Sequence, residues 1–152
     1  MSQRHTGAID RVYLMFRMFG EFYNSEWSNQ QKTRIGIRNR VLTEDERRRC
    51  QEEARKVVCE IGVSMYQFRK WLDERLYLTI EHQAIHEAIE EGIKHKWFVR
   101  SQPRRFDPMK GKERFNVVLT DEGFRLLTDT GFQIAVNAVY TSYLSKSWRR
   151  RA

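Results

Sequence analysis

At 152 residues and 40% hydrophobic composition, the chain is long enough for one domain with a core and short for two. Its 28 Lys and Arg residues against 20 Asp and Glu give a net charge of +8, which favours a polyanionic partner. The only two cysteines, Cys50 and Cys59, exclude a disulfide framework and a four-thiolate zinc site. We expect both to be buried free thiols in a reducing cytoplasm.

The first predicted element is a helix over residues 8–24. Its apolar residues recur at helical spacing, as Ile9, Val12, Tyr13, Phe16, Phe19 and Tyr23. Charged residues interrupt this segment, and no stretch of the chain reaches the roughly 18 apolar residues that span a bilayer. We therefore expect a cytoplasmic protein that makes no membrane contact.

Residues 24–41 break the helical pattern with polar side chains and glycine. This stretch carries a net charge of +3, from Lys32, Arg34, Arg38 and Arg40 against Glu26. It predicts a loop or a short extended segment.

Three short helices joined by tight turns are predicted next. "TEDE" at Thr43 and "SMYQ" at Ser64 are capping boxes that begin the first two, and Gly62 ends the first. Thr79 is predicted to cap the third. The apolar stripes are Cys50, Ala54, Val57, Val58 and Ile61 in the first helix, Met65, Phe68, Leu72 and Leu76 in the second, and Ile80, Ala84, Ile85, Ala88, Ile89 and Ile93 in the third.

A β-hairpin is predicted after these helices. The β-prone runs "WFVRS" and "RFNVVL" flank a segment with both prolines of the chain, so residues near 96–101 should pair antiparallel with residues near 115–120. Thr120 is predicted to cap another helix, and residues 132–147 form the last. The element order predicts a mainly α fold with a small β-hairpin, a winged helix-turn-helix with additional N- and C-terminal helices.

The run from Thr79 to Leu127 resembles the recognition helix and wing of winged-helix DNA-binding regulators, especially the multiple-antibiotic-resistance-regulator (MarR) type. The features are "EEGIKHKWFVR", a helix end followed by an apolar strand, and "KGKERFNVVLTDEG", a basic wing running into "LT..G". They cover about a third of the chain. The resemblance implies a single winged-helix domain over 1–152 with its core at 43–130. Residues 8–24 and 132–147 would then be core or dimerisation helices of a homodimeric transcriptional regulator that binds double-stranded DNA.

Positive charge collects in the predicted hairpin. From Lys94 to Arg114 there are eight Lys or Arg residues against two acids. These side chains could neutralise phosphates or enter a minor groove; the alternative is a solvated hairpin whose charges prevent edge-strand aggregation. The candidate nucleic-acid-binding residues are Arg100, Arg104, Arg105, Lys110, Lys112 and Arg114 in the hairpin, and His82, Gln83 and His86 at the start of the third helix.

The third helix departs from a typical recognition helix, because residues 79–93 contain four acids and no Lys or Arg. Glu87, Glu90 and Glu91 are therefore a candidate face for a protein partner. The alternative function is a winged-helix accessory or inhibitor protein, such as a phage or plasmid could encode, that binds a component of a transcription or nucleoprotein machine.

Catalytic signals are poor. His82 and His86 lie four residues apart, a spacing that can hold a metal, but no third ligand is specified, and ordinary exposed histidines are the expected interpretation. No Ser or Cys lies in a recognisable nucleophile motif. We expect no enzymatic activity, no metal and no cofactor.

Overall fold

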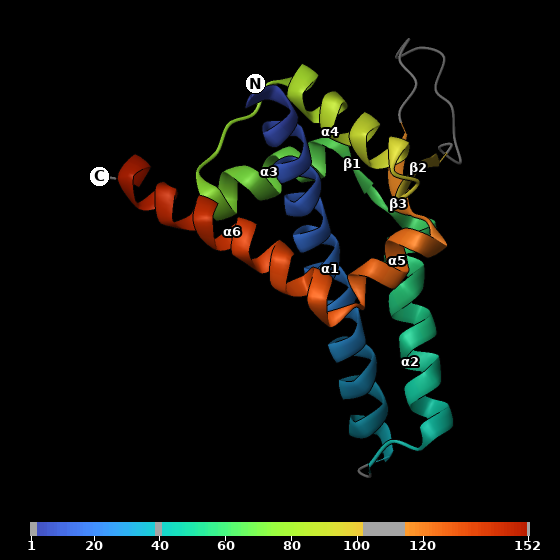
Figure 1. Cartoon of the computed structure of the whole chain (residues 1–152). Coiled ribbons are helices and arrows are strands. Elements are labelled where there is room, and N and C mark those ends of the chain that lie inside the picture. The colour runs from blue at the N-terminus through green and yellow to red at the C-terminus, as the bar shows by residue number, and fades with distance from the viewer. Residues whose placement is uncertain (1–2, 39–40, 102–114, 152) are drawn as a thin grey trace, which may run out of the picture.

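The computed structural model describes residues 3–38, 41–101 and 115–151 (Figure 1). This part of the chain is mainly α, with six α-helices and a small three-stranded antiparallel sheet. The elements are α1 (Gln3–Arg38), α2 (Glu44–Lys56), the π-helical turn η1 (Val57–Ile61), β1 (Val63–Ser64), α3 (Met65–Leu76), α4 (His82–Lys94), β2 (Phe98–Ser101), β3 (Asn116–Leu119), α5 (Asp121–Leu127) and α6 (Thr130–Arg151).

Helix α1 is much longer than predicted. Figure 1 shows it running through the middle of the molecule, with α2 alongside its second half and α6 crossing it. The prediction of a loop over residues 24–41 is wrong, because α1 continues to Arg38. Residues from Glu26 to Ser28 are half-buried, and the Gln30 side chain donates to the Glu26 carboxylate over 2.9 Å. Packing against α2 therefore holds a polar sequence in a helix.

The predicted start at Thr43 and end at Gly62 are confirmed for the helical segment formed by α2 and η1. Thr43 Oγ1 accepts from the Glu46 backbone N–H at 3.2 Å, and the Glu46 carboxylate accepts from the Thr43 N–H at 3.1 Å. Gly62 ends the helical segment at φ +72°, and a Cβ there would overlap the Val117 carbonyl oxygen. The residue at this position must be glycine because both the conformation and the close approach exclude a side chain.

The capping box at Ser64 is confirmed, but the predicted cap of α4 is wrong. Ser64 accepts from the Gln67 N–H at 3.1 Å and begins α3. Helix α4 begins at His82, two residues later than a cap at Thr79 implies, and its N-cap, Glu81, makes no side-chain capping bond. The Ile80 side chain, between Thr79 and the start of α4, is buried in the core. This packing keeps residues 79–81 out of the helical conformation.

The predicted hairpin is confirmed, and a third strand joins it. β2 and β3 pair antiparallel from Phe98 opposite Leu119 to Ser101 opposite Asn116. β1, which the sequence did not predict, pairs with the other edge of β3, so the order is β1-β3-β2. A two-residue strand leaves no periodic pattern in a sequence, and its pairing depends on contacts distant in the chain.

The core lies between α1, the sheet and the other helices. Phe16 of α1 is fully buried, and its ring centroid lies 5.4 Å from that of Phe98 and 4.9 Å from that of Phe132 in α6. The apolar residues of the predicted 8–24 helix thus lie in the core of a single chain. Thr120 caps α5 as predicted, accepting from the Gly123 N–H at 3.1 Å. Within the described residues, no helix is long and apolar enough to cross a membrane.

Candidate nucleic-acid interface

The first turns of α4 present three of the candidate residues to solvent. The buried face of this helix packs against α1 through Ile85, Ala88 and Ile89, which are fully buried. Helical periodicity turns Gln83 away from this face and places His86 at its edge, and His82 is exposed as the first residue of the helix. His82 and Gln83 are exposed and His86 is half-buried. The Nε2 atoms of the two histidines lie 3.1 Å apart.

Arg100 extends this face onto the sheet. β2 lies beside α4, and the Arg100 guanidinium forms an ion pair with the Glu90 carboxylate one helix turn beyond His86. The guanidinium carbon also lies 5.1 Å from the Phe115 ring centroid, and that ring is 6.3 Å from the His86 ring. His82, His86, Phe115, Arg100 and Glu90 thus form one continuous row, which we call the α4–β2 face.

Two of the three acids assigned to a protein-partner face have partners within the chain. Glu90 pairs with Arg100, and Glu91 Oε1 lies 3.2 Å from His95 Nε2, whose ring stacks on Trp97 with centroids 4.4 Å apart. Glu87 is exposed. The negative charge of α4 that a docked duplex would meet is therefore smaller than the sequence indicates.

The remaining candidates lie outside the described residues. These are the hairpin residues Arg104, Arg105, Lys110, Lys112 and Arg114. The ends of the two strands fix where that basic segment begins and ends, because Ser101 is opposite Asn116. The structure thus brings together His82, His86 and Arg100, with Gln83 beside them.

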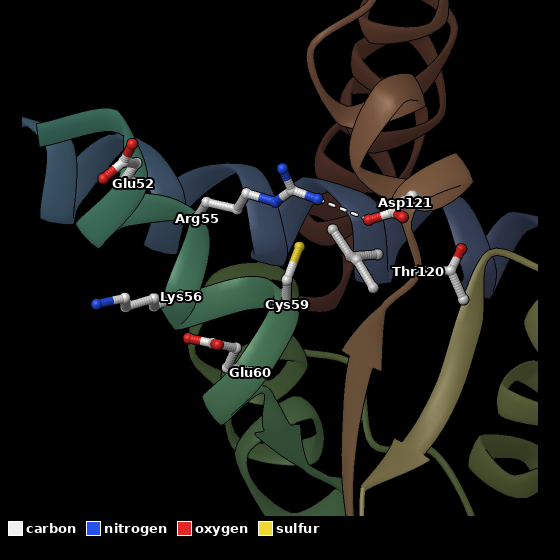
Figure 2. A pocket seen from close by; sticks show the side chains of 8 residues that line it. Glu52, Arg55, Lys56, Cys59, Glu60, Thr120 and Asp121 are labelled. Carbon is white, nitrogen blue, oxygen red and sulfur yellow. Dashed lines mark hydrogen bonds and ion pairs between the residues drawn. The ribbon is translucent and has the colours of Figure 1, made fainter. Parts of the chain in front are cut away.

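A separate pocket of about 510 Å³ lies between α2–η1 and the junction of β3 with α5 (Figure 2). Arg55 crosses it, donating to the Asp121 carboxylate at 2.6 Å, with its guanidinium carbon 4.9 Å from the Phe124 ring centroid. The sequence did not point to this pocket, because the pairing of Arg55 with Asp121 joins residues 66 positions apart. Its only local signal is the acidic first turn of α5.

Cys59 points into the same pocket (Figure 2). Burial raises the pKa of this thiol, and the hydrogen bond and charge of Arg55 oppose that shift only in part. A thiol with a raised pKa is protonated at neutral pH and is a weak nucleophile. Cys50 is buried as expected, whereas Cys59 is only half-buried. The pocket is lined by three acids (Glu52, Glu60 and Asp121) and two basic residues (Arg55 and Lys56), so it offers no net positive charge to a polyanion.

Comparisons with protein-family models, with curated proteins and with solved structures find no significant match. Within residues 3–38, 41–101 and 115–151, no group of three or more His, Cys, Asp or Glu side chains is placed to hold a metal ion. The function of the chain must therefore be inferred from its own geometry.

Proposed function

We propose that the chain is a DNA-binding winged-helix protein, a dimeric transcriptional regulator that contacts double-stranded DNA through α4 and the basic hairpin. The element order supports this assignment. α2, β1, α3 and α4 precede a β2–β3 hairpin, and β3 lies between β1 and β2 in the sheet. In this interpretation α3 and α4 are the helix-turn-helix and the hairpin is the wing.

The observation that carries the proposal is the row that joins the exposed start of α4 to Arg100 on β2. Arg100 pairs with Glu90 and lies over the Phe115 ring, which is next to His86. A duplex that meets this row would contact α4 and the hairpin strand β2 at the same time. The basic residues would bind phosphates and set the register, while Gln83 and the histidines would meet base edges in the major groove.

The acidic character of α4 is the main reason to consider the alternative function, a winged-helix accessory protein that binds a protein partner. The Glu90–Arg100 pair weakens that case, because it compensates one of the charges within the chain. Glu87 remains exposed and is the residue on which a basic partner protein would depend. The two functions differ in one measurable property, the salt dependence of DNA binding.

Binding of a fluorescent duplex at several salt concentrations tests the proposal. The variant in which Arg104, Arg105, Lys110 and Lys112 become Ala should bind all sequences more weakly. Its log–log salt slope should be flatter by up to about 0.9 for each phosphate that the variant no longer neutralises. The matched control removes the same charge from α2, by changing the exposed Arg47, Arg48, Arg49 and Lys56 to Ala, and should change the slope much less.

Base readout is tested separately. Changing Gln83 or His86 to Ala should alter sequence preference by about 1–3 kcal/mol for a good base contact. If the wild type shows no salt-sensitive DNA binding at low ionic strength, the regulator proposal is wrong. In that case Glu87→Gln should abolish capture of the protein partner that the alternative requires.

The proposed homodimer uses the outer face of α6. From Thr130 to Ser145 this helix contains no charged residue, although charged residues are 32% of the chain. Ile134 is 66% exposed, and the side chains on the same outer face are Ala135, Ala138, Thr141, Ser142 and Ser145. Two copies of a chain with charge +8 repel each other, so a self-complementary contact needs a surface without charge. A second copy of this chain is therefore the occupant proposed for the face.

A further inference from the structure

The two histidines at the start of α4 have the geometry of a chelating pair. Their spacing of four residues places both rings on one side of the helix, one turn apart. The rings meet edge to face with centroids 4.6 Å apart, and the Nε2 atoms lie 3.1 Å from each other. The two Nε2 atoms therefore face each other on the outside of the helix.

That separation suits two ligands of one metal ion. With metal–nitrogen bonds of about 2.0–2.1 Å, two imidazole nitrogens are about 3.3 Å apart at a tetrahedral angle and about 2.9 Å apart at a right angle. The observed Nε2–Nε2 distance of 3.1 Å lies between these values. One metal ion could therefore bind both nitrogens without a change in their separation, once the rings turn their Nε2 lone pairs from each other toward the ion.

Exposed carboxylates lie on both sides of the pair in the sequence. Glu81 precedes His82, Glu87 follows His86, and both are exposed. Glu90 lies one turn further along, where Arg100 compensates its charge. The described part of α4 has no Lys or Arg before Lys94, which lies two turns beyond His86. These carboxylates attract a divalent metal ion, whereas the positive end of the helix dipole at His82 and the Arg100 guanidinium act against it.

We propose that His82 and His86 form a chelating site for a divalent transition-metal ion such as Zn²⁺. Imidazole nitrogen suits zinc, copper and nickel, whereas magnesium prefers oxygen ligands. The protein supplies two ligands, and water occupies the remaining positions on the solvent side. The site departs from the sequence expectation of no metal, because that expectation required a third protein ligand. It shares His82 and His86 with the proposed base contacts, but its test needs no nucleic acid.

Calorimetric titration of Zn²⁺ into the full-length, metal-free protein tests the site. The wild type should show one saturable binding event. His82→Gln and His86→Gln should each weaken it at least about tenfold, because one imidazole alone cannot chelate. Glutamine is close in size and helix propensity, so both variants should keep the wild-type circular dichroism. Mg²⁺ should give no saturable binding.

Two control variants test other potential zinc ligands of the chain. His95→Gln removes a histidine on the last turn of α4, and Cys59→Ser removes the half-buried thiol; both should bind zinc within about twofold of the wild type. Absence of saturable binding by the wild type overturns the proposal. So does unchanged affinity in both His82→Gln and His86→Gln, or a loss of binding that follows Cys59→Ser instead.

Discussion

Arg100 and Glu90 decide how much of the α4–β2 face is available to DNA. Their side chains are 38% and 60% exposed, so the pair contributes about 0.2–1 kcal/mol. A DNA phosphate would compete with the Glu90 carboxylate for the Arg100 guanidinium. Glu90→Gln removes that carboxylate and should tighten DNA binding by about 1.4- to 5-fold, whereas Arg100→Ala should weaken it. Fluorescence anisotropy with one duplex at fixed salt measures both effects.

The control for this prediction is Glu74→Gln. Glu74 pairs with Lys70 on α3 at 3.9 Å and is also 60% exposed, so the control makes the same change in net charge at a different place. If Glu74→Gln and Glu90→Gln change the affinity equally, the effect is one of total charge and the local explanation is wrong.

Cys59 and Tyr23 make the stability sensitive to high pH. Burial raises the pKa of the Cys59 thiol above its ordinary value of 9.0 and that of the Tyr23 phenol above 10.0. A raised pKa means that the folded state holds the proton more tightly than the unfolded state does. The stabilisation is therefore complete below about pH 9 and is lost as the pH rises through the folded-state values.

Urea unfolding at pH 7.5, 9 and 10 measures this loss. The free energy of unfolding should fall over that range in the wild type, and it should fall less in Cys59→Ser, whose hydroxyl does not titrate. An identical pH dependence in both proteins would show that the thiol contributes nothing.

At the scale of elements, Gly92 fixes how closely α4 can approach β2. A Cβ at this position would overlap the Phe98 ring, which is fully buried. Gly92→Ala gains about 1 kcal/mol in helix propensity, but overpacking costs about 1–3 kcal/mol, so the variant should be less stable than the wild type. Gly20→Ala in α1 is the matched substitution, because its Cβ would lie 3.7 Å from Leu127 Cδ1, an ordinary contact.

Gly20→Ala should therefore stabilise the protein by about 0.5–1 kcal/mol. Urea denaturation midpoints of the two variants are expected to move in opposite directions. A Gly92→Ala protein at least as stable as the wild type would mean that the packing between α4 and β2 leaves room for a methyl group.

Local signals in the sequence predicted the element ends that local interactions determine. The capping boxes at Thr43 and Ser64 and the glycine at position 62 act within a few residues, and each is confirmed. The continuation of α1 beyond residue 24 depends on packing against α2, which brings together residues distant in the chain. Propensity alone could not predict it, because tertiary burial overrides a polar composition.

For the candidate site, too, the sequence predicted what depends on local spacing and missed what depends on contacts distant in the chain. Helical periodicity predicted that His82 and His86 share one face, and the structure places them in contact. Arg100 was predicted as a basic residue of the hairpin, but its pairing with Glu90 depends on the position of β2 beside α4. The pocket at Arg55 and Asp121 had no signal in the sequence beyond the acidic first turn of α5, because its ion pair joins residues 66 positions apart.

At the scale of the whole molecule, the charge-free face of α6 is the surface proposed to join two copies of the chain. Val136 is fully buried against the core, so α6 already packs through its inner face. Ile134 is 66% exposed on the outer face. If this face joins two copies, Ile134→Glu places like charges opposite each other across a two-fold axis and should convert a dimer into a monomer.

Light scattering at tens of micromolar protein measures the change. Tyr66→Glu is the matched control, since Tyr66 is 72% exposed at the start of α3, and the substitution should leave the dimer intact. A monomeric wild type at this concentration contradicts the dimer. A dimer that Tyr66→Glu dissociates and Ile134→Glu does not would move the interface from α6 to α3.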